Sequence, residues 1–299
     1  MSRHRERPVA HACEAIALRA LLAAFRALPF AAALAAGRLV GRLLALLDRR
    51  HLRVARDQLS DAFGRGSPEA ESARSVYEHL GMCVAELAWV KRRVALGEVG
   101  SWVAIEGLEH VRAALAKGKG LAIVSGHLGN WELGAVAMAS AGIPISIVAR
   151  PMDNPRLERV LLGIRQAGGS EVIAKRNALR AVREVLSRGR ALAVLIDQDA
   201  REHGTFVEFF GRPASTIPSI AAIALRTGAP LVVCAMRREP GCLRHTLAFE
   251  PVEPPAASGD SNEDARRLTA LLTARLEARI RLAPAQWLWM HRRWKTRPA

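Results

Sequence analysis

Cysteine is scarce in this chain and follows no pattern that would give it a structural role. The 299 residues contain four cysteines, Cys13, Cys83, Cys234 and Cys242. None belongs to a Cys-x-x-Cys pair and none has a histidine at zinc-finger spacing, so the sequence indicates neither a structural zinc ion nor a disulfide framework. We therefore expect the chain to work in a reducing compartment such as the cytosol.

The N-terminal segment lacks a long uncharged apolar run, which bears on whether the chain crosses a membrane. Residues 12–47 are rich in leucine and alanine, but arginines interrupt them at Arg19, Arg26, Arg38 and Arg42. The longest uncharged run there, 27–37, contains Pro29 and is shorter than the roughly 20 apolar residues that a spanning helix needs. A signal peptide also fits poorly, because arginine continues through the apolar region.

Two interpretations of this segment stay open. One is an amphipathic helical pair that lies in the membrane surface, with arginines at anionic headgroups and leucine and phenylalanine in the acyl boundary. The other is a helical pair that packs on the protein's own core. Both interpretations can hold at once, for different faces of the helices.

Acidic residues are few relative to basic ones. The chain has 28 aspartates and glutamates against 44 lysines and arginines, a formal charge of +16, which predicts anionic partners such as nucleic acid, acidic lipid headgroups, phosphorylated sugars or an acidic carrier protein. The arginines are spread along the chain, without an RNP-type or helix-turn-helix pattern, so nucleic-acid binding is the least favoured. Four arginines recur at helical spacing and indicate a solvated basic face: Arg42, Arg49, Arg53 and Arg56.

The second half of the chain alternates short apolar runs with helical patterns. We expect strands over 121–125, 145–149, 171–173, 191–196, 231–236 and 244–250, and helices over 131–141, 155–167, 177–188 and 262–282. This rhythm predicts an α/β fold with a mostly parallel sheet flanked by helices. A helical, membrane-associating region over 1–100, with one helix expected over 69–96, precedes an α/β domain over 101–299. No linker long enough to separate them is present, so we expect one structural unit.

A histidine and a glutamate follow the apolar run 121–124, in the segment Ser125-Gly126-His127-Leu128-Gly129-Asn130-Trp131-Glu132. Proteins with open α/β sheets bind their ligands at such strand ends. Imidazole can accept a proton from an alcohol near neutral pH when a carboxylate orients it and stabilises the charged ring. We therefore expect His127 to be a general base and Glu132 its orienting acid, with Gly126 and Gly129 permitting the tight turn.

Polar residues follow two later strands. Arg150 ends the run 145–149, where its guanidinium can hold a phosphate or an anionic intermediate. Asp197 and Asp199 follow the run 191–196, and without an HExxH motif or a set of three histidines they favour an ion-pairing or orienting role over metal binding. No Gly-x-Ser-x-Gly motif is present, and Ser125 lies close enough to the histidine to be a weak candidate nucleophile.

The segment Phe206-Val207-Glu208-Phe209-Phe210-Gly211 allows two interpretations. Its aromatic side chains would ordinarily belong to the hydrophobic core. A Phe-Phe-Gly turn near the site can also line a groove for an acyl chain.

Taken together, these residues resemble the lipid A biosynthesis acyltransferase family, the late acyltransferases that include lauroyl and myristoyl transferases. The resemblance covers most of the chain and rests on motifs that occur in the family's order: Arg49-Arg50-His51, Gly126 to Glu132, Arg150-Pro151 with Asn154, Asp197-Gln198-Asp199, Phe209-Phe210-Gly211, Arg226 to Pro230, and Trp289-Met290-His291-Arg292-Arg293. One departure is Gln58, where the family usually has asparagine.

The resemblance implies transfer of a fatty acyl chain from an acyl carrier protein thioester to a hydroxyl of a lipid A precursor. No cofactor is implied beyond the acyl thioester, which is acyl carrier protein or acyl-CoA. The location implied is the cytoplasmic side of the inner membrane, in a peripheral or monotopic arrangement. His127 and Glu132 are the expected catalytic residues, and the expected substrate-binding residues are Asn130, Arg150, Asp197, Phe210 and Gly211. A related activity stays open, namely acylation of another glycolipid such as a phosphatidylinositol mannoside from acyl-CoA.

Overall fold

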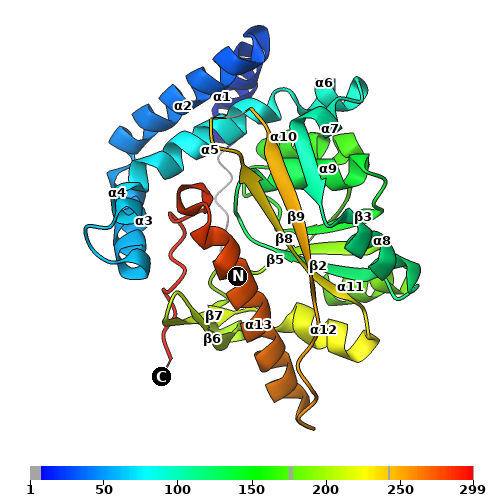
Figure 1. Cartoon of the computed structure of the whole chain (residues 1–299). Coiled ribbons are helices and arrows are strands. Elements are labelled where there is room, and N and C mark those ends of the chain that lie inside the picture. Colours follow the sequence, from blue (N-terminus) through cyan, green and yellow to red (C-terminus); the bar gives the residue numbers. More distant parts are fainter. Residues whose placement is uncertain (1–7, 175–177, 242, 299) are drawn as a thin grey trace.

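The apolar runs of the second half form the strands of one central sheet (Figure 1). The computed structural model describes residues 8–174, 178–241 and 243–298, so Cys242 and the first residue of the helix expected over 177–188 lie outside the described residues. The strands are β1 Val103–Glu106, β2 Leu121–Ser125, β3 Ile145–Ala149, β4 Glu171–Ala174, β5 Ala191–Leu195, β6 Thr205–Phe209, β7 Arg212–Thr216, β8 Leu231–Arg238 and β9 His245–Val252.

Helices surround this sheet and form the N-terminal part up to Trp102. They are α1 Pro8–Ala27, α2 Phe30–Leu47, α3 Arg49–Phe63, α4 Pro68–Glu71, α5 Ala73–Leu87, α6 Val90–Ala95, α7 Val99–Trp102, α8 Leu108–Ala116, α9 Trp131–Ser140, α10 Pro155–Arg165, α11 Ala178–Ser187, α12 Ser219–Thr227 and α13 Ser261–Arg281. Short 3-10 turns are η1 Gln166–Gly168, η2 Arg201–His203 and η3 Pro284–Gln286. The predicted helical N-terminal part and the predicted mixed α/β class are confirmed.

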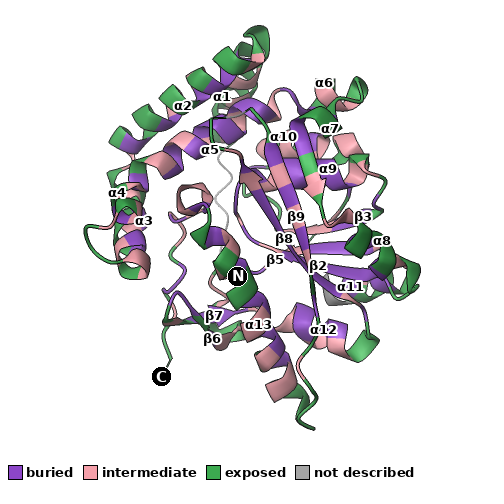
Figure 2. Ribbon diagram, in the orientation of Figure 1, coloured by how far each residue is buried: buried purple, intermediate pink, exposed green. Residues whose placement is uncertain are grey.

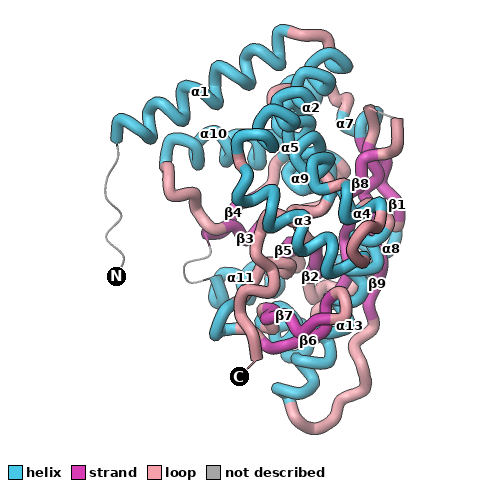
Figure 3. The backbone as a smooth tube through the Cα atoms, turned by 90° about the vertical axis from the view of Figure 1, so that its left-hand side faces the viewer, coloured by secondary structure: helices cyan, strands magenta, loops and turns pink. Residues whose placement is uncertain are grey.

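The sheet has the order β1-β9-β8-β2-β5-β3-β4. All neighbouring strands run parallel except β8 and β9, which pair antiparallel over their whole lengths. The expected mostly parallel sheet is therefore confirmed. Figure 3 shows α1 at the top of the molecule, α10 beneath it, and the β6–β7 hairpin near the bottom.

The two faces of the sheet belong to two hydrophobic cores. Along β2, Ala122 and Val124 pack with α11, α12 and α13, whereas Leu121 and Ile123 pack with α8 and α9. This follows from the two-residue period of a strand, which sends successive side chains to opposite faces. A continuous apolar run such as 121–124 is typical of a parallel strand that is buried on both faces, and Figure 2 shows the central strands buried.

Three features differ from the sequence-based expectation. The helix expected over 69–96 is divided into α4, α5 and α6, and Ser72 Oγ donates to the carbonyl of Glu69 at the first break, an interaction that competes with helical hydrogen bonding. The short strand β1 and the β6–β7 hairpin were not predicted, because neither has a long alternating pattern.

Glycines bring α2 and α5 into unusually close contact. A Cβ atom on Gly37 would lie 2.5 Å from the carbonyl oxygen of Gly81, and one on Gly41 would lie 2.2 Å from that of Tyr77. The α2 face that carries these glycines is buried, which confirms packing on the protein's own core for one face. By length and composition, α1 and α2 could each cross a membrane.

We predict that Gly41→Ala destabilises the protein, because the added methyl group would overlap backbone atoms of α5 and force the helices apart. The expected loss is about 1–3 kcal/mol in the free energy of unfolding, measured by urea denaturation with tryptophan fluorescence. Gly100→Ala is the matched control, since a Cβ atom there meets nothing within 4 Å. Equal unfolding midpoints for the two variants would contradict the close packing.

Candidate active site

His127 lies in the turn between the end of β2 and the start of α9. Two glycines make this turn possible. A Cβ atom on Gly126 would lie 2.9 Å from the Asp197 carboxylate, and Gly129 has a φ of +63° and would place a Cβ atom 2.2 Å from the carbonyl oxygen of Met236. The predicted need for glycine therefore has two physical causes, which are room for a carboxylate and a left-handed backbone.

The carboxylate that orients His127 belongs to Asp197, in the segment after β5. His127 Nδ1 lies 2.8 Å from Asp197 Oδ1, and the backbone N–H of His127 donates to Oδ2 at 2.6 Å. Trp287 Nε1 donates to the same Oδ2 at 2.7 Å. The Asp197 side chain is only 2% exposed. With three donors around it, this buried carboxylate is held in one orientation and fixes the plane of the imidazole.

The contact between His127 and Asp197 shifts the pKa of each side chain in the direction expected for an ion pair. Burial lowers the pKa of His127, but the charge and hydrogen bond of Asp197 raise it by more, so it lies above its ordinary value of 6.5. Burial raises the pKa of Asp197, and His127 lowers it by more, to about 2. Asp197 is therefore ionised at neutral pH and stabilises the imidazolium that forms when His127 takes a proton.

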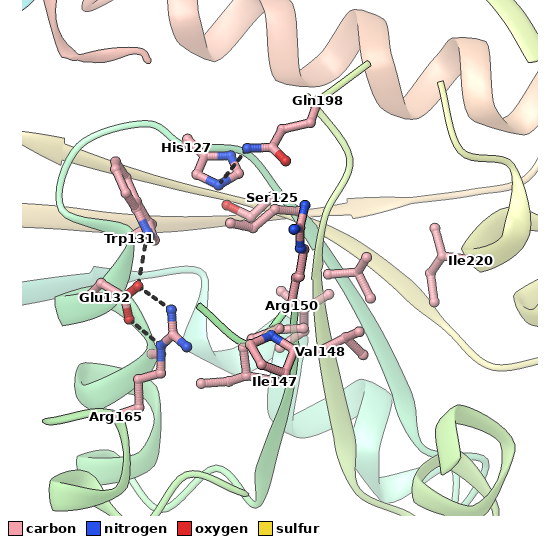
Figure 4. Close-up of a pocket in the computed structure, with 18 of the residues that line it drawn as sticks. Ser125, His127, Trp131, Glu132, Ile147, Val148, Arg150, Arg165, Gln198 and Ile220 are labelled. Atoms are coloured by element: carbon pink, nitrogen blue, oxygen red, sulfur yellow. Dashed lines mark hydrogen bonds and ion pairs between the residues drawn. The ribbon is translucent and has the colours of Figure 1, made fainter. Parts of the chain in front are cut away.

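Glu132 does not fill the role predicted for it as the orienting acid. Its carboxylate accepts from Arg165 Nε at 2.7 Å and from Arg165 Nη2 at 2.6 Å, and Trp131 Nε1 donates to it at 3.2 Å. Figure 4 shows Trp131 between the glutamate and His127. Glu132 lies in the first turn of α9, whereas His127 precedes that helix, so a spacing of five positions does not place the two side chains face to face. Its charge still raises the pKa of His127.

Asn130, expected to bind substrate, is instead a buried helix cap. Its Oδ1 accepts from the backbone N–H of Leu133, and its Nδ2 donates to Glu86 Oε2 at 2.8 Å. Glu86 is fully buried and also pairs with Arg238 at 2.6 Å and His245 at 2.7 Å. Burial raises the pKa of Glu86, but these partners lower it to about 2. Because its polar atoms are bonded within the protein, Asn130 positions the start of α9.

Phe210 and Gly211, also expected to bind substrate, belong to the turn of the β6–β7 hairpin. Both have positive φ, at 52° and 68°, as a two-residue hairpin turn of type I′ requires. The Phe210 ring is buried against Phe63 and Trp289, and Gly211 is exposed. Neither residue lines the cavity described next, so the structure favours the core interpretation of this aromatic segment.

A cavity of about 1330 Å³ lies at the carboxyl ends of β3 and β5. Its polar lining includes Ser125, His127, Glu132, Arg150 and Arg165, and its apolar lining includes Ile147, Val148, Val182, Ile217, Ile220 and Ile223. Figure 4 shows the polar groups on one side and Ile220 on the other, with Arg150 between them. The cavity volume exceeds that of an ordinary small-molecule site.

The cavity opens where two strands separate. β3 and β5 pair only from Ile145 to Ile147, opposite Ala191 to Ala193. Beyond that point Val148 and Val194 remain only half-buried and line the cavity. Side chains that alternate along these strands reach the cavity from both faces of the sheet.

Among the described residues three arginines line the cavity, Arg150, Arg165 and Arg180. The Arg150 side chain is 70% exposed and lies 3.1 Å from Asp153, consistent with the expected strand-end position. Arg165, which sequence reasoning missed, is mostly buried, and its Nη1 has no hydrogen-bond partner among the described residues. Arg165 ends α10, and arginine in the last turn of a helix is too common to mark it as a site residue from the sequence. Within the described residues, no three His, Cys, Asp or Glu side chains group closely enough to hold a metal ion.

The C-terminal segment holds the His127 turn in place through backbone hydrogen bonds. This explains why the motif over 289–293 accompanies the His127 motif although the two are far apart in the sequence. Leu288 N–H donates to the carbonyl of His127 at 3.1 Å, and Gly129 N–H donates to that of Gln286 at 3.0 Å. Arg293 is fully buried and donates to the carbonyl of Ser215 at 2.5 Å and to that of Gln198 at 3.3 Å. Trp287 and Gln198 were not expected as site residues, and Gln198 Nε2 lies 3.5 Å from His127 Nε2.

In this fold a histidine–aspartate pair lies at the wall of a large, largely apolar cavity. The family described as bacterial lipid A biosynthesis acyltransferase matches residues 4–296. The chain belongs to this family and is an acyltransferase.

Named relatives include two lipid A enzymes of Escherichia coli strain K12. The lauroyltransferase is 28% identical over 271 residues, 87% of this chain and 84% of its own length. The palmitoleoyltransferase is 29% identical over 281 residues, 91% of this chain and 87% of its own length. A phosphatidylinositol mannoside acyltransferase of Mycolicibacterium smegmatis is 26% identical over 204 residues, 66% of this chain and 64% of its own length.

With His127 as the base, we predict that kcat/KM for acyl transfer falls as the pH drops through the raised pKa of the imidazole. Asp197→Asn removes the negative charge that raises this pKa, so the acid limb should move to lower pH while the plateau falls by about 10²–10⁴-fold. Asp199→Asn is the control, because Asp199 contacts Thr296 rather than His127. An acid limb that stays in place in Asp197→Asn would refute the pairing.

We also predict that Asn130→Asp destabilises the protein, since two carboxylates would then face each other in a buried site. The expected cost is about 3 kcal/mol in the free energy of unfolding, measured by urea denaturation. The matched control is Asn262→Asp, at an exposed asparagine of α13, which should unfold as the wild-type protein does. Equal unfolding midpoints for Asn130→Asp and this control would contradict the contact.

Proposed function

We propose that this protein transfers a fatty acyl chain from the thioester of acyl carrier protein to a hydroxyl of a lipid A precursor, in lipopolysaccharide biosynthesis. The observation that carries the proposal is the His127–Asp197 pair at the wall of the large cavity. Membership of the family supports the acceptor class.

In this mechanism His127 Nε2 accepts the proton of the acceptor hydroxyl while the oxygen attacks the thioester carbonyl carbon. Nδ1 keeps its proton and donates a hydrogen bond to the carboxylate of Asp197, whose charge stabilises the imidazolium. As the tetrahedral intermediate collapses, the new ester bond remains and the carbon–sulfur bond breaks. The departing thiolate takes the proton from Nε2, which returns the imidazole to its neutral form. No covalent bond to the enzyme is formed, and Ser125 Oγ instead donates to the carbonyl of Cys234 at 2.6 Å.

The arginines supply positive charge where the reaction needs it. Arg165 lines the cavity, and its Nη1 has no hydrogen-bond partner in the part of the chain that the structure describes, so its guanidinium suits the oxyanion of the tetrahedral intermediate. Glu132 then serves catalysis by holding this guanidinium through two hydrogen bonds. Arg150 is more exposed and suits a phosphate of the acceptor.

The apolar part of the cavity suits the acyl chain. Ile217, Ile220 and Ile223 line it from the segment before α12 and from α12 itself, and Val182 lines it from α11. An acyl chain placed there would leave its thioester carbonyl near His127, and the depth of this part would limit the chain length. The thioester is the only co-substrate this chemistry needs, and the excess of basic residues favours an acidic carrier protein over a neutral donor.

The acceptor is a membrane lipid, so the enzyme must reach a bilayer. The apolar helices α1 and α2 provide the means, because both carry exposed leucine, isoleucine or valine side chains. α2 is packed on α5 through glycines, which favours helices that lie in the cytoplasmic surface of the inner membrane over helices that span it.

A second acceptor class has support from one observation. Relatives named phosphatidylinositol mannoside acyltransferase match about two thirds of this chain, and the proton chemistry at His127 would be the same for their glycolipid. The two acceptor classes can be separated with purified enzyme. It is assayed with acyl carrier protein thioester and with acyl-CoA, each against both acceptors.

The proposal predicts that a strain without this protein makes lipid A that lacks one acyl chain, as read by mass spectrometry. The wild-type gene should restore the chain, and His127→Ala should fail because the loss of a general base costs about 10²–10⁴-fold in rate. His110→Ala, at an exposed histidine of α8, is the matched control and should restore it. Unchanged lipid A after deletion would refute the acceptor, and restoration by His127→Ala would refute the base.

A further inference from the structure

Gln198 contacts the nitrogen of His127 that takes the proton in the proposed mechanism. Its Nε2 lies 3.5 Å from His127 Nε2 (Figure 4). The ionised carboxylate of Asp197 faces Nδ1 at 2.8 Å and can only accept a hydrogen bond, so Nε2 of the neutral ring carries a lone pair and the amide N–H of Gln198 donates to it. The distance is at the long end for a hydrogen bond, so a hydroxyl group can displace the amide.

The backbone around Gln198 is held in place, whereas its side chain has room to move. The carbonyl of Gln198 accepts from Arg293 Nη1 at 3.3 Å, and the backbone N–H of Asp199 donates to His291 Nε2 at 3.0 Å. The Gln198 side chain is exposed and lines the cavity, and within the described part of the chain its amide has no hydrogen-bond partner besides His127. The amide can therefore leave the imidazole without any change in the backbone.

Water can reach His127, because its side chain is 16% exposed at the wall of the cavity. A thioester next to an uncovered base would be hydrolysed: Nε2 would take a proton from water while the water oxygen attacked the carbonyl carbon. The carbon–sulfur bond would then break, and Nε2 would return the proton to the thiolate, which leaves a fatty acid and a thiol. An acyltransferase with an accessible base therefore needs a group that keeps water from Nε2 until the acceptor binds.

We propose that the amide of Gln198 covers His127 Nε2 until the acceptor binds, and so directs the enzyme toward acyl transfer and away from hydrolysis of its donor. This inference rests on the proposed function, which supplies the thioester donor and the hydroxyl acceptor. The acceptor hydroxyl displaces the amide because the rest of the acceptor molecule also contacts the protein. A water molecule has no such additional contacts, so it competes poorly with an amide that is tethered beside the ring.

The chemistry of an amide suits this position better than that of a charged side chain. A carboxylate could not donate to the neutral ring. An ammonium or guanidinium group could donate, but its charge would oppose the positive charge that His127 gains when it takes the proton of the acceptor. The amide of Gln198 covers the neutral base and adds no net charge beside the imidazolium.

The test compares hydrolysis with transfer in the full-length enzyme and in Gln198→Ala. With acyl carrier protein thioester and no acceptor, the release of free thiol measures hydrolysis, and Gln198→Ala should raise its rate about fivefold, the equilibrium effect of losing one hydrogen bond to the base. With lipid A precursor at saturation, the transfer rate should stay close to that of the wild type, because the bound acceptor has already displaced the amide. Gln166→Ala, at an exposed glutamine that does not line the cavity, is the matched control and should leave both rates unchanged.

The contact itself can be tested without substrate, by the pKa of His127 from an NMR titration. A donor at Nε2 favours the neutral ring and lowers this pKa, so Gln198→Ala should raise it by about 0.7, which is fivefold in the ionisation constant. Gln198→Glu should raise the pKa further, because a carboxylate accepts from the protonated ring. A merely structural role for Gln198 would instead lower the unfolding midpoint of the variant and leave the pKa of His127 unchanged.

Hydrolysis at the wild-type rate in Gln198→Ala would overturn the inference, and so would an unchanged pKa of His127 in this variant. A transfer rate that falls while hydrolysis stays constant would assign Gln198 to binding of the acceptor, which also overturns it. Faster hydrolysis and a raised pKa in Gln198→Ala, together with no transfer to the lipid A precursor by the wild-type enzyme, would support the role of Gln198 and refute the proposed acceptor instead.

Discussion

The contact between the buried carboxylate of Asp197 and the imidazole of His127 is the constraint on which the rest of the site depends. An isolated carboxylate at this depth would be strongly destabilising, so the surrounding chain must supply donors on every side. His127 supplies two, one from the ring and one from the backbone, and Trp287 supplies the third. Gly126 is required because a Cβ atom at that position would crowd the same carboxylate.

The hydrogen bonds to the Asp197 carboxylate thus bring together three parts of the chain that are distant in the sequence. The turn after β2, the segment after β5 and the C-terminal segment meet at Asp197, and the backbone bonds of Leu288 and Gly129 hold the third part to the first. Asn130 connects this centre to α5 through Glu86, and α5 in turn packs on the apolar helix α2. The turn that carries His127 and the apolar helix α2 are therefore both held against α5.

Much of the fold followed from local patterns. The runs 121–125 and 145–149 are strands with the expected bounds, because continuous apolar residues between glycine-rich breaks have few alternatives in an α/β chain. The same apolar pattern predicted correctly that His127 lies just after the end of a strand. Asp197 was expected to order the local polar network, and the structure places it directly on the imidazole.

The pairing of charges could not be predicted in the same way. Glu132 was expected to orient His127, but it binds Arg165 from α10, and nothing in a linear spacing reveals which helix packs beside another. Phe210 shows the same limit, since burial of its ring depends on Phe63 and on tryptophans near the C-terminus. Tertiary packing decides such contacts, and only residues inside one strand or one helix turn have partners that spacing can predict.

The most direct test of this account is the tautomer of His127, read from the 15N chemical shifts of the imidazole above its pKa. The structure predicts a proton on Nδ1, donated to Asp197, and an unprotonated Nε2 that faces the cavity and can act as a base. Asp197→Asn should reduce or abolish this preference. A proton found on Nε2 in the neutral wild-type ring would contradict the proposed mechanism.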